Sequence, residues 1–255
     1  MFRTCQIALF WLMTAAVALP AQSVSAADDK WEPIFDGKTL KNWDGNPAFW
    51  SVKDGAITGR TTKENPTKGN TFVIWRGGEV GDFELKLQYK IVGGNSGIQY
   101  RSFEPDSKKQ KWVVGGYQAD IDSGTTYSGI NYGERTGRGI LAGRGTHTSY
   151  DAAGKKTEER FGNSKELQGK IKNEEWNDYH IVAKGNNCVH TINGVKMSEL
   201  TDNDKRALKK GILALQLHAG PPMVVQFRNI MLKRTGAKKS AAVPQKKKKK
   251  TDSGS

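Results

Sequence analysis

The chain is poor in cysteine, with only Cys5 and Cys188 among its 255 residues. Residues 1–27 are predicted to be a removable signal peptide, so the mature protein would keep Cys188 alone. That excludes an intramolecular disulfide, and a single thiol in an exported protein could be reactive. Cys188 nevertheless lies inside an alternating segment next to a hairpin signal, which favours a buried packing role.

Long hydrophobic runs are also missing. The one apolar stretch, residues 7–19, is too short to span a bilayer as a helix. Arg3 precedes it and small residues follow at positions 24–27, which is the pattern of a cleavable export signal. We therefore expect an exported protein, periplasmic or extracellular, with no transmembrane segment.

Several sequence motifs of catalysis and metal binding are absent. The sequence has no G-x-S-x-G, no Walker A, no H-E-x-x-H, no complete EF-hand loop and no cysteine pair for zinc. Residues 120–124 begin like a calcium loop but lack the later acidic ligands. Residues 137–142 match G-x-G-x-x-A, but neither a parallel-sheet pattern nor a helical period flanks them, so the match is interpreted as accidental. No metal and no cofactor are predicted.

The positive charge is concentrated at the C-terminus. The formal net charge is +14, and residues 235–255 contribute seven lysines against one aspartate. This segment is poor in apolar residues and is predicted to be disordered. It is either a solvated tail or an attachment to an anionic envelope polymer, through Lys246, Lys247, Lys248, Lys249 and Lys250. Because export would remove the protein from the nucleoid, nucleic acid is not a predicted partner.

Residues 28–234 are long enough for one all-β domain. Short alternating segments separated by turn residues predict strands at 49–58, 71–75, 83–91, 95–101, 117–122, 179–191, 211–218 and 223–232. Asp54-Gly55 and Asn193-Gly194 predict hairpin turns, and short helices are expected within 163–172 and 200–210. Residues 123–170 show no clear strand pattern. These elements predict a β-sandwich or jelly roll.

Three of the predicted strands carry polar groups on one face. Alternation places Gln118, Asp120 and Asp122 together, Gln99 with Arg101, and Gln216 with His218. If these strands share a sheet, they line a polar concavity suited to a sugar. A solvated sheet face alternates in the same way, but short groups of definite geometry favour a site.

Carboxylates near a histidine and an arginine can transfer protons on a sugar and stabilise developing negative charge. A lectin uses the same residue types to bind hydroxyls, and spacing alone leaves both interpretations open. His180 and His190 lie within predicted strands and are interpreted as structural, whereas His218 lies at a strand end.

Several segments together resemble the DUF1080 family, the 3-keto-disaccharide hydrolase (3-keto-glucoside lyase and 3-keto-2-hydroxy-glucal hydratase) domain. They are residues 34–43 (Ile-Phe-Asp-Gly-Lys-Thr-Leu-Lys-Asn-Trp), 50–55 (Trp-Ser-Val-Lys-Asp-Gly), 95–98 (Asn-Ser-Gly-Ile), 116–120 (Gly-Tyr-Gln-Ala-Asp), 215–218 (Leu-Gln-Leu-His) and 227–230 (Phe-Arg-Asn-Ile). The resemblance covers roughly residues 31–234. It implies a concanavalin A-like lectin/glucanase jelly-roll sandwich with a carbohydrate cleft.

The resemblance also implies chemistry on glycosides oxidised at C3. A base removes the acidified C2 hydrogen, the glycosidic oxygen leaves, and water adds to the resulting glucal. On that chemistry the acid–base candidates are Asp120, Asp122 and His218, and Arg101 would stabilise the enolate. Substrate-binding candidates are Gln99, Tyr117, Gln118, Tyr132, Glu134, Arg138 and Gln216.

One position departs from the family pattern. Many members have Glu two residues before the position of Gln118, where this chain has Gly116. Two functions therefore stay open. One is an enzyme that cleaves 3-keto-glycosides, and the other is a non-catalytic lectin-like module that the basic tail could tether to the cell envelope.

Overall fold

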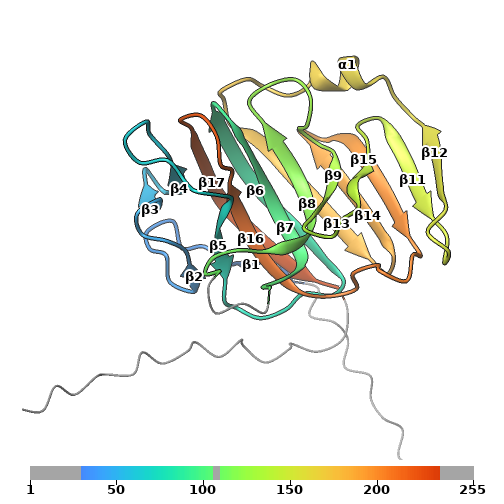
Figure 1. Ribbon diagram of the computed structural model, residues 1–255, viewed down its shortest axis with the longest axis horizontal. Coiled ribbons are helices and arrows are strands. Elements are labelled where there is room, and N and C mark those ends of the chain that lie inside the picture. The colour runs from blue at the N-terminus through green and yellow to red at the C-terminus, as the bar shows by residue number, and fades with distance from the viewer. Residues whose placement is uncertain (1–29, 106–109, 236–255) are drawn as a thin grey trace, which may run out of the picture.

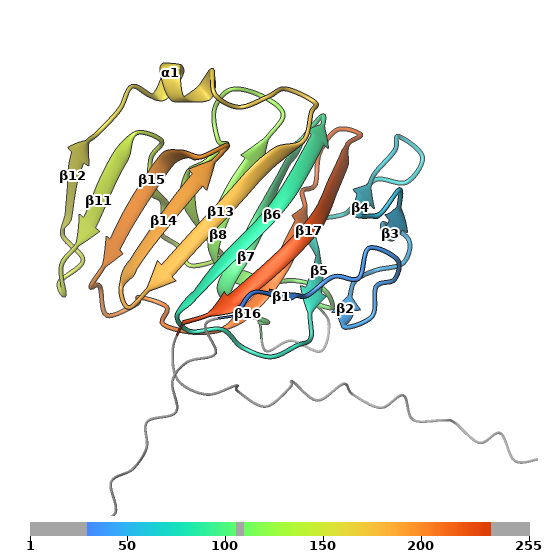
Figure 2. The same ribbon diagram turned by 180° about the vertical axis from the view of Figure 1, so that it is seen from behind.

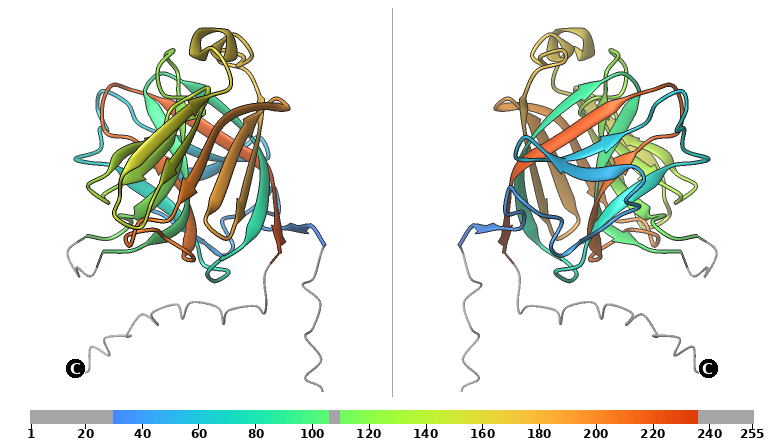
Figure 3. Two further views of the ribbon diagram at one scale, coloured as in Figure 1. Left: turned by 90° about the vertical axis from the view of Figure 1, so that its right-hand side faces the viewer. Right: turned by 90° about the vertical axis from the view of Figure 1, so that its left-hand side faces the viewer.

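The computed structural model describes residues 30–105 and 110–235. The predicted signal peptide and nearly all of the predicted lysine-rich tail lie outside the described residues. Within them, two mainly antiparallel sheets stack face to face, as Figures 1 and 2 show from opposite sides and Figure 3 shows edge-on. No helix in the described ranges is long and apolar enough to cross a membrane.

The sheet nearer the viewer in Figure 2 is described with ten strands in the order β12-β11-β15-β14-β13-β6-β17-β4-β3, with β1 paired to β17. Its strands are β1 (Glu32–Pro33), β3 (Trp50–Lys53), β4 (Ala56–Arg60), β6 (Phe83–Val92), β11 (Thr146–Tyr150), β12 (Lys156–Arg160), β13 (Asn177–Lys184), β14 (Asn187–Ile192), β15 (Val195–Asp202) and β17 (Val224–Arg234).

The second sheet has seven described strands in the order β10-β9-β8-β7-β16-β5-β2. They are β2 (Trp43–Asp44), β5 (Thr71–Trp75), β7 (Asn95–Phe103), β8 (Gly115–Asp122), β9 (Asn131–Glu134), β10 (Gly139–Ala142) and β16 (Ile212–Leu217). The predicted polar strands β16, β7 and β8 are direct neighbours here, as expected from the sequence. The two-sheet sandwich confirms the predicted fold class.

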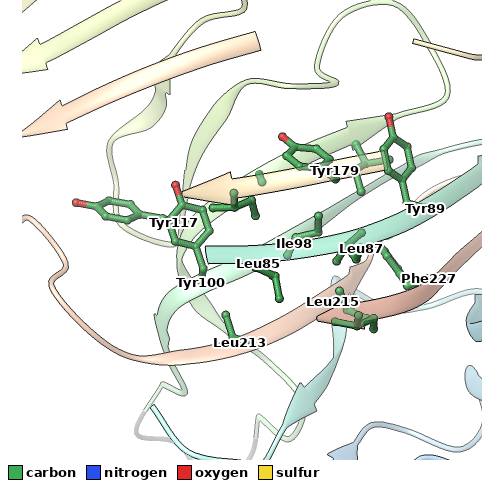
Figure 4. Packing of buried hydrophobic residues seen from close by; sticks show 14 of the residues in the cluster. Leu85, Leu87, Tyr89, Ile98, Tyr100, Tyr117, Tyr179, Leu213, Leu215 and Phe227 are labelled. Atoms are coloured by element: carbon green, nitrogen blue, oxygen red, sulfur yellow. The ribbon is translucent and has the colours of Figure 1, made fainter. Parts of the chain in front are cut away.

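The core lies between the sheets and uses every second residue of the central strands. Figure 4 shows Leu85, Leu87 and Tyr89 of β6 packing against Ile98 and Tyr100 of β7, with other inward side chains of both sheets around them. Burying one such aliphatic side chain stabilises the fold by about 1.5–3 kcal/mol. Inward alternation in β7, β8 and β16 leaves their other face outside the core, and that face carries the polar residues.

Both predicted hairpin turns are confirmed. Asp54 and Gly55 have φ values of 51° and 74°, and Asn193 and Gly194 have 50° and 79°, which are the left-handed pairs that a two-residue type I′ turn requires. The short helix α1 (Ser164–Gln168) is also confirmed. Asn163 caps it, because its side-chain oxygen accepts from the backbone N–H groups of Lys165 and Glu166.

Two expectations were wrong. The helix expected within 200–210 is absent, because residues 200–202 complete β15 and turns follow. Residues 123–170 contain four strands, β9 to β12, where no strand pattern was visible. All five residues of β12 are exposed, since it pairs only with β11 at the sheet edge, so it has no apolar face for alternation to reveal.

Candidate functional site

The outward face of the seven-stranded sheet carries a band of polar side chains on β8, β7 and β16, which we call the polar face and define by Gln99, Gln118, Asp120 and Gln216. The strand register explains their proximity. Gln99 pairs with Gln118 and Gly97 pairs with Asp120. Ala214 pairs with Gln99, so Gln216, two residues further along β16, lies level with Gly97. Figure 1 shows these strands side by side.

A chain of hydrogen bonds runs along the polar face and ends on Asp120. Ser102 Oγ donates to Gln99 Oε1 at 2.9 Å. Gln99 Nε2 donates to Gln118 Oε1, and Gln118 Nε2 donates to Asp120 Oδ1. Each amide accepts on one side and donates on the other, so the chain fixes the orientation of both glutamines and of the Asp120 carboxyl.

Asp120 has a strongly perturbed acidity. Its pKa is raised to about 8, chiefly by burial and also by the negative charges of Glu134 and Asp122, although the hydrogen bond from Gln118 lowers it. A carboxyl group of this kind keeps its proton near neutral pH yet can exchange it. Acid–base catalysis is most efficient when the pKa of the group lies near the working pH.

Gly97 leaves the space in which this network forms. A Cβ at position 97 would overlap the side chain of Gln118, which lies across it. On the other side of Gly97, Gln216 is fully buried, and neither its Oε1 nor its Nε2 has a hydrogen-bond partner among the described residues. Buried amides are almost always hydrogen-bonded, so Gln216 has an unused donor and acceptor in the same row as Asp120, with Gly97 between them.

A hollow of about 370 Å³ lies beyond one end of the polar face, and none of the four residues that define the face lines it. Asn95, Asp122 and His218 line it together with the loop after β16, including Pro221 and Met223. This volume is at the lower end of the range of small-molecule sites. Asn95 pairs with Asp122, and Gly97 pairs with Asp120. The hollow therefore lies two residues further along β7 and β8 than the row that holds Asp120.

Asp122 and His218 reach this hollow but are held by the backbone. The Asp122 carboxylate accepts from the N–H groups of Gly124, Thr126 and Tyr127 at 3.0–3.2 Å. It therefore organises the loop after β8 and has little capacity left for proton transfer. His218 Nδ1 lies 2.5 Å from the carbonyl oxygen of Ala219; since a carbonyl only accepts, Nδ1 donates.

Tyr132 and Glu134 of β9 extend the polar face beyond β8. Tyr132 pairs with Gln118 and Glu134 pairs with Gly116. Burial raises the pKa of Tyr132, and the charges of Glu134 and Asp120 add to that effect. Asn70 Nδ2 donates to Glu134 Oε1 at 3.4 Å, while Asn70 Oδ1 accepts from the backbone N–H of Ala219. Asn70 thus connects Glu134 with the loop after β16.

Arg101 is not on the polar face, contrary to the prediction. The ladders of β7 with both neighbours shift register around it, and its φ is 46°, so this bulge reverses the side-chain alternation. Its guanidinium donates to the carbonyls of Gly81, Gly185 and Leu208 and pairs with Asp82 at 3.0 Å. With 1% of its surface exposed, Arg101 ties loops of both sheets together and does not face a ligand.

Tyr117 and Arg138, predicted to bind substrate, are also placed elsewhere. Tyr117 packs in the core, where its hydroxyl donates to Asp202 and accepts from Leu208 N–H. Arg138 forms a bidentate pair with Asp202, at 2.6 and 3.0 Å, and lies over the ring of Tyr150. These groups make a buried link to β15. Sequence reasoning overlooked Asp202 because a short helix was expected within residues 200–210, where β15 in fact ends.

The structure explains why position 116 has no side chain. Gly116 has a φ of +145°, and a Cβ there would overlap the Ser102 side chain. A glutamate could not enter this position unless Ser102, which orients Gln99, moved. Sequence reasoning also missed Ser102 and Asn70, because neither belongs to a motif.

No group of three or more His, Cys, Asp or Glu side chains within the described ranges is arranged to hold a metal ion. His190 is buried in the core with Nε2 3.0 Å from the Tyr100 hydroxyl, and burial lowers its pKa to about 3. His180 contacts Glu84 at 3.0 Å on the ten-stranded sheet. Both histidines are therefore structural, as predicted.

A two-sheet sandwich of this kind, with amide and carboxyl groups on one outer face, is a jelly-roll fold, which lectin domains share. Residues 30–233 match the family model of the 3-keto-alpha-glucoside-1,2-lyase-like domain. The chain belongs to this carbohydrate-active family, which confirms the resemblance seen in the sequence. No curated protein matches the chain.

Solved structures share the fold. Two candidate glycosyl hydrolases from Parabacteroides distasonis are similar: one at 24% identity with a TM-score of 0.51, covering 80% of this chain and 99% of its own, and one at 19% identity with a TM-score of 0.52, covering 81% and 94%. A Bacillus subtilis protein with a galectin-like fold aligns at 11% identity and a TM-score of 0.50, covering 78% and 92%. At these identities the likeness concerns the fold alone.

Proposed function

We propose that this protein is an enzyme that cleaves the glycosidic bond of 3-keto-glycosides by removal of the C2 proton, β-elimination and hydration. The observation that carries the proposal is the state of Asp120, a buried carboxyl at the end of an ordered amide chain, whose pKa is raised to about 8. Asp202, a buried carboxylate with a structural role, is instead paired with Arg138.

The 3-ketone is the feature that makes this chemistry accessible to carboxyl groups. It acidifies the C2 hydrogen and stabilises the resulting enolate, so neither an oxocarbenium-like transition state nor a redox step is needed. Asp120 supplies a proton-transfer group, and Gln216, two strands away on β16, offers a donor and an acceptor without partners among the described residues to sugar hydroxyls. The hollow lined by Asn95 and His218 lies two residues along the strands from this row and is the proposed entrance for a ligand.

The family membership supports the same substrate class, since its model is that of a 3-keto-alpha-glucoside-1,2-lyase-like domain. We further propose that the protein acts after export, on the basis of the predicted signal peptide.

The test is release of product from 3-keto-trehalose, 3-keto-lactose and a chromogenic 3-keto-glucoside by the full chain, with the unoxidised sugars as controls. Asp120→Asn removes the proton but preserves the shape and the hydrogen bond from Gln118. Asp54→Asn is the matched control, because Asp54 is exposed in a hairpin turn that asparagine also favours.

Release from keto substrates only, lost in Asp120→Asn and retained in Asp54→Asn, is the expected result. If no keto substrate is cleaved at any pH, while calorimetry still detects sugar binding, the protein is a lectin-like binding module and the enzymatic proposal is wrong.

A further inference from the structure

The proposed reaction, on which this inference rests, needs two proton-carrying groups. In the elimination, the C2–H bond breaks, its proton passes to a base, and its electron pair is held in the enolate of the 3-ketone. That electron pair then forms the C1=C2 bond as the C1–O bond breaks. The leaving oxygen takes a proton from an acid. In the hydration, water oxygen adds to C1, a water proton refills the acid, and the base returns its proton to C2. Both groups end as they began.

Asp120 is one of these groups, and the second must lie beside it. Asp122 is engaged by three backbone N–H groups, and Arg101 points to the other side of the sheet. His218 follows β16, two strands from β8, and its Nδ1 donates to the carbonyl oxygen of Ala219. On β9, the strand next to β8, the titratable groups on the same face as Asp120 are Tyr132 and Glu134, and the charge of Glu134 acts on Asp120.

The register of β8 and β9 brings Glu134 to the same surface. Tyr132 is paired with Gln118 and is therefore a diagonal neighbour of Asp120, about 7–8 Å away between Cα atoms. Glu134 follows Tyr132 on the same face, opposite Gly116. Gly116, the residue of β8 that pairs with Glu134, has no side chain. The Glu134 carboxylate is therefore not covered by a side chain from β8.

Glu134 is 9% exposed, and no ion pair to it occurs among the described residues. Its one hydrogen-bond partner there is the neutral amide of Asn70, at 3.4 Å. A mostly buried carboxylate without a cation costs stability, unlike Asp202 or Asp204, which face arginines. Such an arrangement is typical of a group kept for its chemistry.

We propose that Glu134 is the second catalytic acid–base residue, which takes the C2 proton while Asp120 protonates the leaving oxygen. The two carboxyl groups share one face of β8 and β9, and the base and the acid hold opposite protonation states at the start of the reaction. Asn70 positions the Glu134 carboxylate through its bond to the loop after β16. The negative charge of Glu134 also helps to keep the proton on Asp120.

Exchange of the C2 hydrogen in D2O, followed by NMR on a 3-keto-glucoside, separates the two roles. Proton removal needs the base but not the acid. Asp120→Asn should therefore keep C2 exchange within about tenfold of wild type and lose product release. Glu134→Gln should lose both by about 100-fold or more, the usual size of a general-base contribution, and Glu134→Asp should recover part of the exchange.

A second readout guards against a merely structural effect. Removing the Glu134 charge lowers the pKa of Asp120, so a carboxyl NMR titration of Glu134→Gln should show Asp120 titrating at lower pH than in wild type. C2 exchange at the wild-type rate in Glu134→Gln would overturn this assignment while the enzymatic proposal stands. A wild-type protein that neither exchanges C2 nor releases product would overturn both.

Discussion

Replacing Asp120 by Asn should make the protein more stable at neutral pH, and the gain should grow with pH. The folded protein holds the Asp120 proton up to a pKa of about 8, against 3.8 as the ordinary value. Between these two pH values the unfolded chain binds fewer protons than the native state, so the free energy of unfolding falls as pH rises. Below pH 4 both states are protonated and the penalty vanishes.

The magnitude follows from the proton linkage. A difference of one bound proton changes the free energy of unfolding by about 1.4 kcal/mol per pH unit. Between pH 4 and pH 7 the free energy of unfolding of the wild type should therefore fall by about 4 kcal/mol, and that of Asp120→Asn should not show this loss. The asparagine side chain of this variant would accept the same hydrogen bond from Gln118, which keeps the amide chain intact. Urea unfolding of both proteins from pH 4 to pH 8 measures the difference.

Asp122→Asn provides a matched comparison two residues away. Its carboxylate accepts three backbone N–H groups, so its replacement should lower stability at neutral pH. If the unfolding free energies of wild type and Asp120→Asn run parallel from pH 4 to pH 8, Asp120 is ionised like an ordinary carboxylate, and the role assigned to it is refuted.

Four further outcomes are expected. Arg101→Ala should lower the free energy of unfolding by about 3–5 kcal/mol, since it leaves buried carbonyls and a carboxylate unpaired; unchanged stability with lost activity would argue for a catalytic role. Gly116→Ala should destabilise by more than about 1 kcal/mol in chemical denaturation, because of its positive φ and the overlap with Ser102; a neutral effect would contradict this geometry. Gln216→Met should raise the melting temperature yet weaken sugar binding in calorimetry, and unaltered affinity would exclude Gln216 from the site. Cys188 should resist a thiol reagent at pH 8 in the native state, because burial raises its pKa to about 11, and rapid labelling would disprove its burial.

Strand alternation was sufficient to predict the polar face. Gln99, Gln118, Asp120 and Gln216 fall on one side of their strands because the period of two is undisturbed there, and the apolar partners fix which side is buried. The same rule failed at Arg101, where a bulge inserts an extra residue and turns the side chain to the opposite face. A bulge carries no reliable sequence signal, since Arg-Ser-Phe reads as ordinary strand.

Asp120 and Asp122 could not be separated by sequence, although their environments differ greatly. Both lie on the same face of β8. Asp120 is enclosed by neighbouring strands, whereas Asp122 meets the N–H groups of the loop that follows. Acidity depends on this burial and on charges from β9, a strand that the glycine-rich composition of its segment did not predict.

Two glycines of the seven-stranded sheet leave space for side chains of the site, which could not be predicted from the residue type alone. Gly97 gives room to the Gln118 side chain, and Gly116 gives room to Ser102. Gln118 and Ser102 are the two residues that hold Gln99 from either side, and the chain they form ends on Asp120. A side chain at either glycine would displace a member of this chain and leave the Asp120 carboxyl free to rotate. The glycines in the middle of β7 and near the start of β8 therefore belong to the same functional unit as the acid whose orientation depends on them.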